Sequence, residues 1–233
     1  MRSARGISVL ALAAAISGLA SAAMAAELVV VEARGVGLKQ GEVIDDAKPI
    51  TLKDGQLLTL VAENGTILTL RGPYDQAPSG GGSGVDVGNA LVALTTKNAQ
   101  RNVAGVVRTG AEEVHLPSPW LVDVSHPGTT CLKQGERPVF WRTGNAGGTL
   151  TLMPADRSWR GQTPWPGGTS TLAAPNNFPI KDGRTYLADF GGKTVAVTLT
   201  QLPPAVTNTR MQAAWMLEKG CVAQAEALLK TIR

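Results

Sequence analysis

Alternation of apolar and polar residues is clearest in two neighbouring segments, Gln56–Glu63 and Thr66–Arg71. Every second residue is apolar, as expected for strands that bury one face of a sheet. These residues are Leu58, Leu60, Ala62, Leu68 and Leu70. Asn64–Gly65 joins the two segments, and this pair accepts the positive φ angles of a type I′ turn. The pattern therefore predicts a β-hairpin.

Shorter β-like segments precede the hairpin. Leu28–Glu32 is rich in β-branched residues, three glycines between residues 35 and 41 interrupt it, and Pro49–Leu52 resumes the β pattern. Asp54–Gly55 then provides a turn before the hairpin. We expect residues 26–73 to form a small β domain.

A tract rich in Gly and Ser, residues 79–84, follows this domain. Such a composition has little to bury, so residues 74–118 are predicted to be a flexible linker. Within the linker, residues 86–98 carry apolar side chains at helical spacing, and Asp86 can cap the first turn. We therefore expect one short helix over residues 86–98.

Short β-like runs separated by Gly, Pro and Asn turns continue from Pro119 at intervals of about ten residues. They are Trp120–Val124, Thr129–Leu132, Pro138–Arg142, Thr149–Met153, Ser170–Ala173, Thr185–Asp189 and Thr194–Gln201. This spacing is typical of an antiparallel β-sandwich, which we expect over residues 119–204. The fold class predicted for the whole chain is mainly β.

The last segment, residues 205–233, has the apolar stripe of an amphipathic helix, interrupted at Lys219–Gly220 as at a helix C-terminus. We expect a helical hairpin. The run Trp215–Cys221, with Ala225 and Leu228–Leu229 after it, resembles the helix-turn-helix junction of a tetratricopeptide unit. A single unit of this kind cannot bury its own apolar face, so we expect the hairpin to dock on the sandwich.

The N-terminus has the three parts of a secretory signal peptide. Arg2 and Arg5 are followed by the apolar run Ile7–Ala20 and by the cleavage signature Ala23–Ala25. A membrane anchor would need roughly 20 firmly apolar residues and no such signature. We expect residues 1–25 to be removed and the product to be a soluble periplasmic protein without a remaining membrane span.

Charge and cysteine content narrow the function classes. The chain has 22 basic and 18 acidic residues, which does not indicate a nucleic-acid partner. Cys131 and Cys221 are the only cysteines, and in an oxidising compartment they predict one disulfide. A catalytic thiol is the alternative, but it needs a basic partner, and His115 and His126 are the only histidines.

One segment of the first module carries a family resemblance. Leu52–Gln56, the hairpin with its Glu63–Thr66 connection, and Gly72–Pro73 resemble the small β-domain of FecR-type periplasmic signalling proteins. The resemblance is confined to this module, and a cleavable leader stands where that family has a cytoplasmic segment and a membrane span. It implies an extracytoplasmic sensing or scaffolding module.

Few residue patterns indicate chemistry. His115 and His126 flank two prolines and have no third ligand nearby, so we expect no metal site, and no motif predicts a cofactor. Asp123, Ser125 and His126 have the composition of a hydrolase triad. Strand alternation, however, places Asp123 and Ser125 on one face and His126 on the other.

The best candidate binding surface is a segment predicted to be a loop, residues 156–166, in which two indoles alternate with two guanidinium groups. Its residues are Arg157, Trp159, Arg160, Gln162 and Trp165. Exposed Trp and Arg are enriched in protein interfaces, and indoles also stack on sugar rings. Burial of Trp159 and Trp165 against the sheet is the alternative to ligand contact.

These observations predict a non-enzymatic exported binding protein, a sensor or scaffold in envelope signalling whose partner is an envelope protein. The first alternative is a glycan- or peptidoglycan-binding protein that uses the two indoles. The second is an envelope hydrolase built on Asp123, Ser125 and His126.

Overall fold

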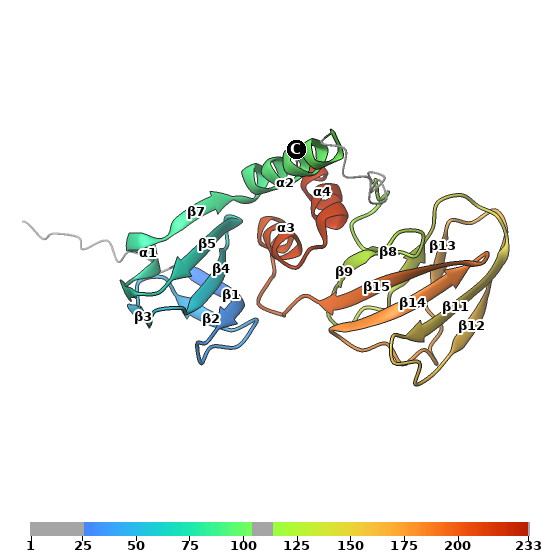
Figure 1. Cartoon of the computed structure of the whole chain (residues 1–233), viewed down its shortest axis with the longest axis horizontal. Coiled ribbons are helices and arrows are strands. Elements are labelled where there is room, and N and C mark those ends of the chain that lie inside the picture. The colour runs from blue at the N-terminus through green and yellow to red at the C-terminus, as the bar shows by residue number, and fades with distance from the viewer. Residues whose placement is uncertain (1–25, 104–113, 233) are drawn as a thin grey trace, which may run out of the picture.

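The computed structural model describes residues 26–103 and 114–232. Two β modules lie on either side of a group of helices, as Figure 1 shows. The mainly-β fold class and the C-terminal helix pair predicted from the sequence are confirmed. The expected leader, residues 1–25, and residues 104–113 of the expected linker lie outside the described residues.

The first module is an antiparallel sheet of five strands in the order β2-β1-β4-β5-β7, with a two-stranded β3–β6 sheet beside it. Its elements are β1 (Glu27–Arg34), β2 (Val43–Asp45), β3 (Ile50–Leu52), β4 (Leu57–Ala62), β5 (Thr66–Arg71), β6 (Tyr74–Gln76), α1 (Pro78–Gly81) and β7 (Ser83–Asp86). Strands β4 and β5 form the predicted hairpin.

The hairpin turn differs from the predicted type I′ turn. Gly65 alone of its residues has a positive φ, at 83°, while a type I′ turn needs two positive φ angles. The connection between the strands consists of three residues, Glu63, Asn64 and Gly65. The Asn64 side chain stabilises it, because its Oδ1 accepts a hydrogen bond from the Thr66 N–H at 2.9 Å. Gly65 still fulfils its predicted role of supplying the left-handed residue.

The main sheet of this module is buried on both faces. Leu28 and Val30 of β1 pack into one core with the β3 side of the module, while Val29 and Val31 pack into a second core with the C-terminal helices. The alternation in the hairpin predicted one buried face only. The second face, which carries Val61 and Ile67, is also buried because helices from the far end of the sequence cover it.

The Gly-rich tract differs from the predicted flexible linker, because its start belongs to α1 and its end, from Ser83, belongs to strand β7 of this sheet. Strand β7 pairs with β5, and Gly82 and Gly84 allow close approach to that strand. A Cβ on Gly84 would lie 2.8 Å from Thr66 Cγ2, and one on Gly82 would lie 2.9 Å from Leu68 Cδ2. The missing side chains thus serve packing.

The second module contains a five-stranded sheet, β12-β11-β14-β15-β9, and a three-stranded sheet, β13-β10-β8. Its strands are β8 (Leu121–Asp123), β9 (Gly128–Leu132), β10 (Val139–Trp141), β11 (Gly148–Pro154), β12 (Gly161–Trp165), β13 (Thr171–Ala173), β14 (Arg184–Phe190) and β15 (Lys193–Gln201). The sheets are mixed and depart from the purely antiparallel prediction, because β8 pairs with β10, and β9 with β15, in parallel.

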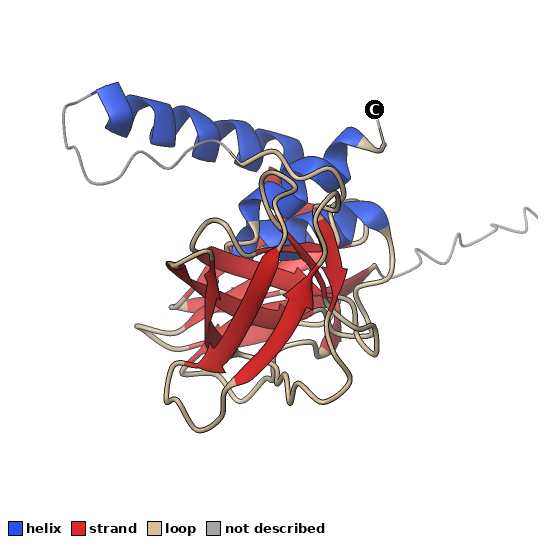
Figure 2. Cartoon of the chain, turned by 90° about the vertical axis from the view of Figure 1, so that its right-hand side faces the viewer, coloured by secondary structure: helices blue, strands red, loops and turns tan. Residues whose placement is uncertain are grey.

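Three helices connect the modules. They are α2 (Val87–Val103), α3 (Thr209–Glu218) and α4 (Val222–Lys230). Asp86 caps α2 through a 2.8 Å bond from the Gly88 N–H, and Gly220, with φ of 81°, turns the chain between α3 and α4. Figure 2 shows the helices gathered along one side of the strands.

The helix pair contacts both modules. Its apolar residues pack against α2 and the first sheet, where Trp215 of α3 is fully buried, in addition to the side on which we expected it to dock, the sandwich. It is also tied to the second module: Cys221 bonds Cys131 of β9, Gln224 of α4 bonds the backbone of β8 and β9, and Leu202 and Trp120 pack into the same apolar cluster as the helices. Both modules therefore share one C-terminal element.

Candidate functional site

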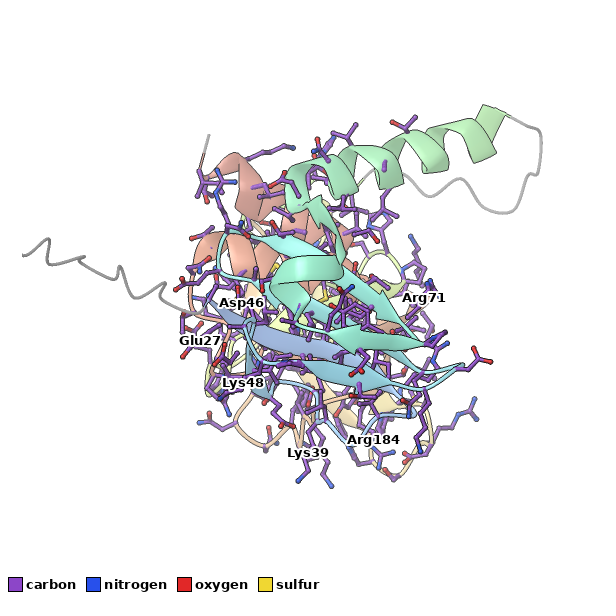
Figure 3. The ribbon with its side chains drawn as sticks, turned by 90° about the vertical axis from the view of Figure 1, so that its left-hand side faces the viewer. Glu27, Lys39, Asp46, Lys48, Arg71 and Arg184 are labelled. Atoms are coloured by element: carbon purple, nitrogen blue, oxygen red, sulfur yellow. A yellow bond between two sulfur atoms is a disulfide. The ribbon has the colours of Figure 1, made fainter. Side chains whose placement is uncertain are left out.

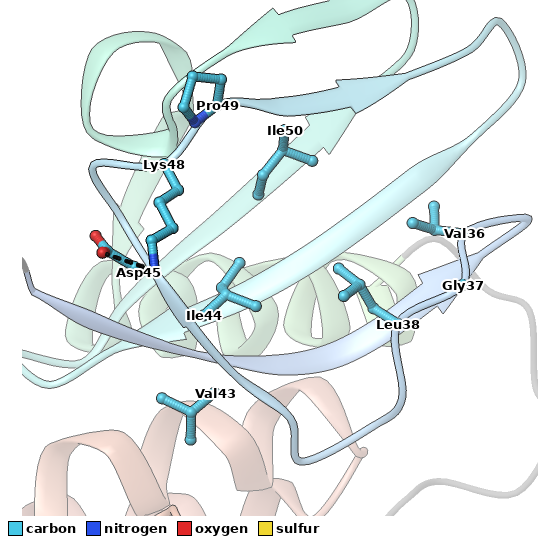
Figure 4. A pocket seen from close by; sticks show the side chains of 9 residues that line it. All are labelled: Val36, Gly37, Leu38, Val43, Ile44, Asp45, Lys48, Pro49 and Ile50. Carbon is cyan, nitrogen blue, oxygen red and sulfur yellow. Dashed lines mark ion pairs between the residues drawn. The ribbon is translucent and has the colours of Figure 1, made fainter.

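A groove of about 490 Å³ opens on the first module (Figure 4). It lies between the β1–β2 loop, strand β2 and the start of β3. Its lining residues are Val36, Gly37, Leu38, Val43, Ile44, Asp45, Lys48, Pro49 and Ile50. This volume is within the range of ligand-binding pockets, and most of the lining is aliphatic.

The groove is an extension of the module's core. Leu38, Ile44 and Ile50 are half-buried and pack against the core that contains Leu28 and Leu58. Figure 4 shows Ile44, Ile50 and Leu38 around the groove, with the Asp45–Lys48 ion pair at one end. The carboxylate and ammonium of that pair are 3.5 Å apart. The site therefore combines an apolar floor with one charged end.

Among the described residues, the strand beside the groove has an unpaired edge. Strand β2 is the outermost strand of its sheet there, and its partner is β1. The Glu42 carbonyl accepts a bond from the Val30 N–H, and the Asp46 N–H donates to the Ala26 carbonyl, so alternation directs the N–H and C=O of Val43 toward the open edge. The Val43 side chain is 43% exposed. An extended chain could add to this edge.

The loop that forms one wall of the groove is held by Lys219, the residue directly after α3. Lys219 Nζ donates to Val31 O at 2.7 Å and to Gln40 Oε1 at 3.0 Å. Gly41 lies against the connection between β15 and α3, where a Cβ on it would be 2.8 Å from Pro203 Cβ. These contacts fix the wall of the groove to the C-terminal element.

The same junction contains two charged groups with shifted pKa values. Burial lowers the pKa of Lys219, although the nearby carboxylates of Glu32, Glu218 and Asp182 oppose the shift. Burial raises the pKa of Glu218, and the Glu32 carboxylate raises it further. The charges at this junction are thus partly removed from water.

The predicted Arg/Trp loop is partly a strand. Residues 161–165 form β12, which pairs with β11 at the edge of the sheet and tolerates Pro164 there. Arg157, Arg160 and Gln162 are exposed, while Trp165 points inward and is 1% exposed. The predicted surface residues therefore divide between the outside and the core.

Neither indole of this segment offers two free faces. The Arg142 guanidinium carbon lies 4.9 Å from the centroid of the Trp165 ring, and the Phe190 ring lies 5.6 Å away. Trp159 packs against Phe178 and Tyr186, at centroid distances of 5.7 and 5.9 Å. Trp165 is therefore buried against the sheet, as the alternative prediction had it, and Trp159 is half-buried.

The structure corrects one expectation about Asp123 and His126. Strand β8 ends at Asp123 and the chain bends through residues 124–126, so strand alternation does not apply to His126. Its Nδ1 lies 2.8 Å from Asp123 Oδ2. The Ser125 hydroxyl oxygen accepts a 3.0 Å bond from the Thr143 N–H, and the Ser125 N–H donates to Asp123 Oδ1. The described contacts of Ser125 thus stabilise the bend.

The predicted disulfide between Cys131 and Cys221 is present, and both residues are buried. His115 lies 3.7 Å from the Glu226 carboxylate, whereas His126 pairs with Asp123. Within residues 26–103 and 114–232, no group of three His, Cys, Asp or Glu residues is arranged to hold a metal ion. In the same residues, no helix is long and apolar enough to span a membrane.

The groove was not predicted from the sequence. The glycines between residues 35 and 41 were interpreted as strand breaks, although Val36 and Leu38 alternate with them. Val36 and Leu38 are apolar residues in a Gly-rich connection outside any strand, and this pattern could have indicated the groove. Their assembly with Ile44 and Ile50, however, depends on how the two sheets of the module meet.

No protein-family model matches this chain, and no curated protein sequence matches it.

Proposed function

We propose that this chain is a non-enzymatic, exported binding protein of the bacterial periplasm, a sensor or scaffold in envelope signalling. Its first module binds an extended apolar segment of an envelope protein. The observation that carries this proposal is the aliphatic groove beside the unpaired edge of β2. The likeness of residues 52–73 to the FecR-type domain supports an extracytoplasmic role, as does the disulfide.

The proposed binding mode is strand addition. A partner segment pairs its backbone with the open edge at Val43 and places alternate side chains into the groove. Such pairing supplies affinity through main-chain hydrogen bonds, while the shape of the groove selects the side chains. Leu38, Ile44 and Ile50 favour aliphatic side chains, and the Asp45–Lys48 pair favours a polar residue at one end.

Selection from a library of displayed peptides tests this function. Peptides that bind the exported protein should share apolar residues at every second position, and their amide chemical-shift changes should centre on residues 36–45. Val43→Glu places a charge at the edge and should weaken binding at least tenfold. Val85→Glu is the matched control, because Val85 is 47% exposed on β7 at the opposite edge of the same sheet.

Two outcomes contradict the proposal. One is a set of selected peptides that shows no alternation of apolar residues. The other is equal binding to the Val43→Glu and Val85→Glu variants, which would place the binding surface elsewhere.

A further inference from the structure

Ala26 and Asp46 form a reciprocal pair of hydrogen bonds at the end of the β1–β2 ladder. The Ala26 N–H donates to Asp46 Oδ1 at 2.9 Å, and the Asp46 N–H donates to the Ala26 carbonyl oxygen at 3.0 Å. Ala26 directly precedes β1 and is exposed, while Asp46 directly follows β2 and is half-buried. A carboxylate therefore contacts the backbone nitrogen at the very start of the sheet.

Ala26 is also the residue that follows the predicted cleavage signature, Ala23–Ala25. Cleavage adds water across the Ala25–Ala26 peptide bond, leaving a carboxylate on Ala25 and an α-amine on Ala26. At neutral pH that amine takes up a proton, because α-amino groups titrate at roughly pH 7.7–8.0. A neutral N–H would thus be replaced by a positively charged group with three donors.

The other charged groups at this corner have different partners or are exposed. Asp45 Oδ2 lies 3.5 Å from Lys48 Nζ, and Asp45 Oδ1 accepts from the Ala47 N–H at 2.9 Å. Glu27 is exposed. Figure 3 shows Glu27, Asp46 and Lys48 near one another on the first module. Asp46 is the residue whose carboxylate is in hydrogen-bond distance of the Ala26 nitrogen.

We propose that Asp46 receives the mature α-ammonium group of Ala26, so that removal of the leader converts an existing hydrogen bond into an ion pair. This ion pair fixes the end of β2 beside Asp45 and Lys48, which line the groove. An acylated or extended N-terminus carries no charge at this position. The inference rests on cleavage after Ala25 and is independent of what the groove binds.

The test compares the exported protein with its Asp46→Asn variant, each before and after selective acetylation of the α-amine at mildly acidic pH. Peptide mapping would verify that Ala26 is the first residue and the site of acetylation. Asn keeps an oxygen that can accept the hydrogen bond but has no charge. Urea unfolding then gives the folding equilibrium constant of all four proteins.

Acetylation should lower the folding constant of the native chain about two- to fivefold, the range of an exposed ion pair, and should leave that of Asp46→Asn unchanged. Asp54→Asn is the control, since Asp54 is an exposed carboxylate in a turn of the same module, and it should retain the full acetylation effect. Equal effects in the native and Asp46→Asn proteins would overturn the proposal. So would an exported chain that begins at a residue other than Ala26.

Discussion

The side-chain amide of Gln224 bonds both polar groups of the Cys131 backbone. Its Oε1 accepts from the Cys131 N–H at 2.6 Å, and its Nε2 donates to the Cys131 carbonyl oxygen at 2.9 Å and to Pro119 O at 2.7 Å. Gln224 is 2% exposed. A helix thereby satisfies backbone groups in the second module that would otherwise be buried without partners.

Replacing Gln224 should therefore destabilise the protein strongly. Gln224→Ala removes the partner of the buried Cys131 backbone groups and of the half-buried Pro119 carbonyl, and should cost about 2 to 4 kcal/mol. Gln224→Glu should cost more at pH 7, because a carboxylate cannot donate to the two carbonyl oxygens. Urea unfolding measures both changes.

Gln212→Ala is the matched control for that prediction. Gln212 lies on α3, is half-buried, and makes longer bonds of 3.2 and 3.4 Å to the carbonyls of Thr207 and Val206. Its replacement should cost less than about 1 kcal/mol. Similar losses of unfolding free energy in Gln224→Ala and Gln212→Ala would show that the bonds to Cys131 do not stabilise the protein more than those of Gln212.

The disulfide should contribute a large part of the stability. It joins residues separated by 90 positions, and closing a loop of this length stabilises by on the order of 4 to 5 kcal/mol in the chain-entropy account. We expect dithiothreitol to lower the urea midpoint of the native chain and to leave that of Cys131→Ala/Cys221→Ala unchanged. An intact mass showing two free thiols in the exported protein would contradict the presence of this disulfide.

Glu218 should make stability depend on pH. Burial and the Glu32 carboxylate raise its pKa in the folded protein above 4.5, the usual value of a glutamate. Its favourable contribution is therefore fully present below pH 4.5 and is lost as the pH rises through the folded pKa. Glu218→Gln should stabilise the protein at pH 7, by less than about 1 kcal/mol because solvent screens the group, and should have a smaller effect at pH 4.

The check is a pair of urea titrations at pH 4 and pH 7 on the native chain and on Glu218→Gln. Glu226→Gln is a useful comparison, since Glu226 pairs with Lys230 at 2.6 Å on the other helix. A gain from Glu218→Gln of the same size at both pH values would mean that titration of this carboxyl does not cause it.

Arg157 occupies a left-handed backbone conformation, with φ of 56°. A side chain in this region costs roughly 1 kcal/mol, and glycine avoids that cost. Arg157→Gly should raise stability by up to about 1 kcal/mol, as measured by thermal unfolding. Arg160→Gly, three residues further on without a positive φ, should instead lower it. Equal changes at the two sites would refute the strain explanation.

Local patterns predicted the hairpin, the helix pair and most strands of the second module because each depends on neighbouring residues. Gly65 and Gly220 both have the positive φ expected at their turns. The second burial surface of β1 and β4 was not predictable in this way. It forms against Met211 and Trp215, which come from the opposite end of the chain.

The candidate sites show the same limit. Trp165 is in a segment with the composition of a binding loop, but pairing of β12 with β11 turns its indole into the core over Arg142. His126 meets Asp123 because the chain bends, which alternation along a strand does not anticipate. The disulfide was predictable because Cys131 and Cys221 were the only cysteines available.

We propose that a segment of an envelope protein lies in the groove beside β2. A photo-crosslinking residue placed at position 43, in cells that export the protein, tests this binding directly, with position 85 as the control. We expect a crosslinked envelope protein at position 43 and none at position 85, joined through an extended segment with alternating apolar residues, and we expect this product to disappear when Ile44→Asp is added. No crosslink at position 43, or the same products at both edges, would contradict it.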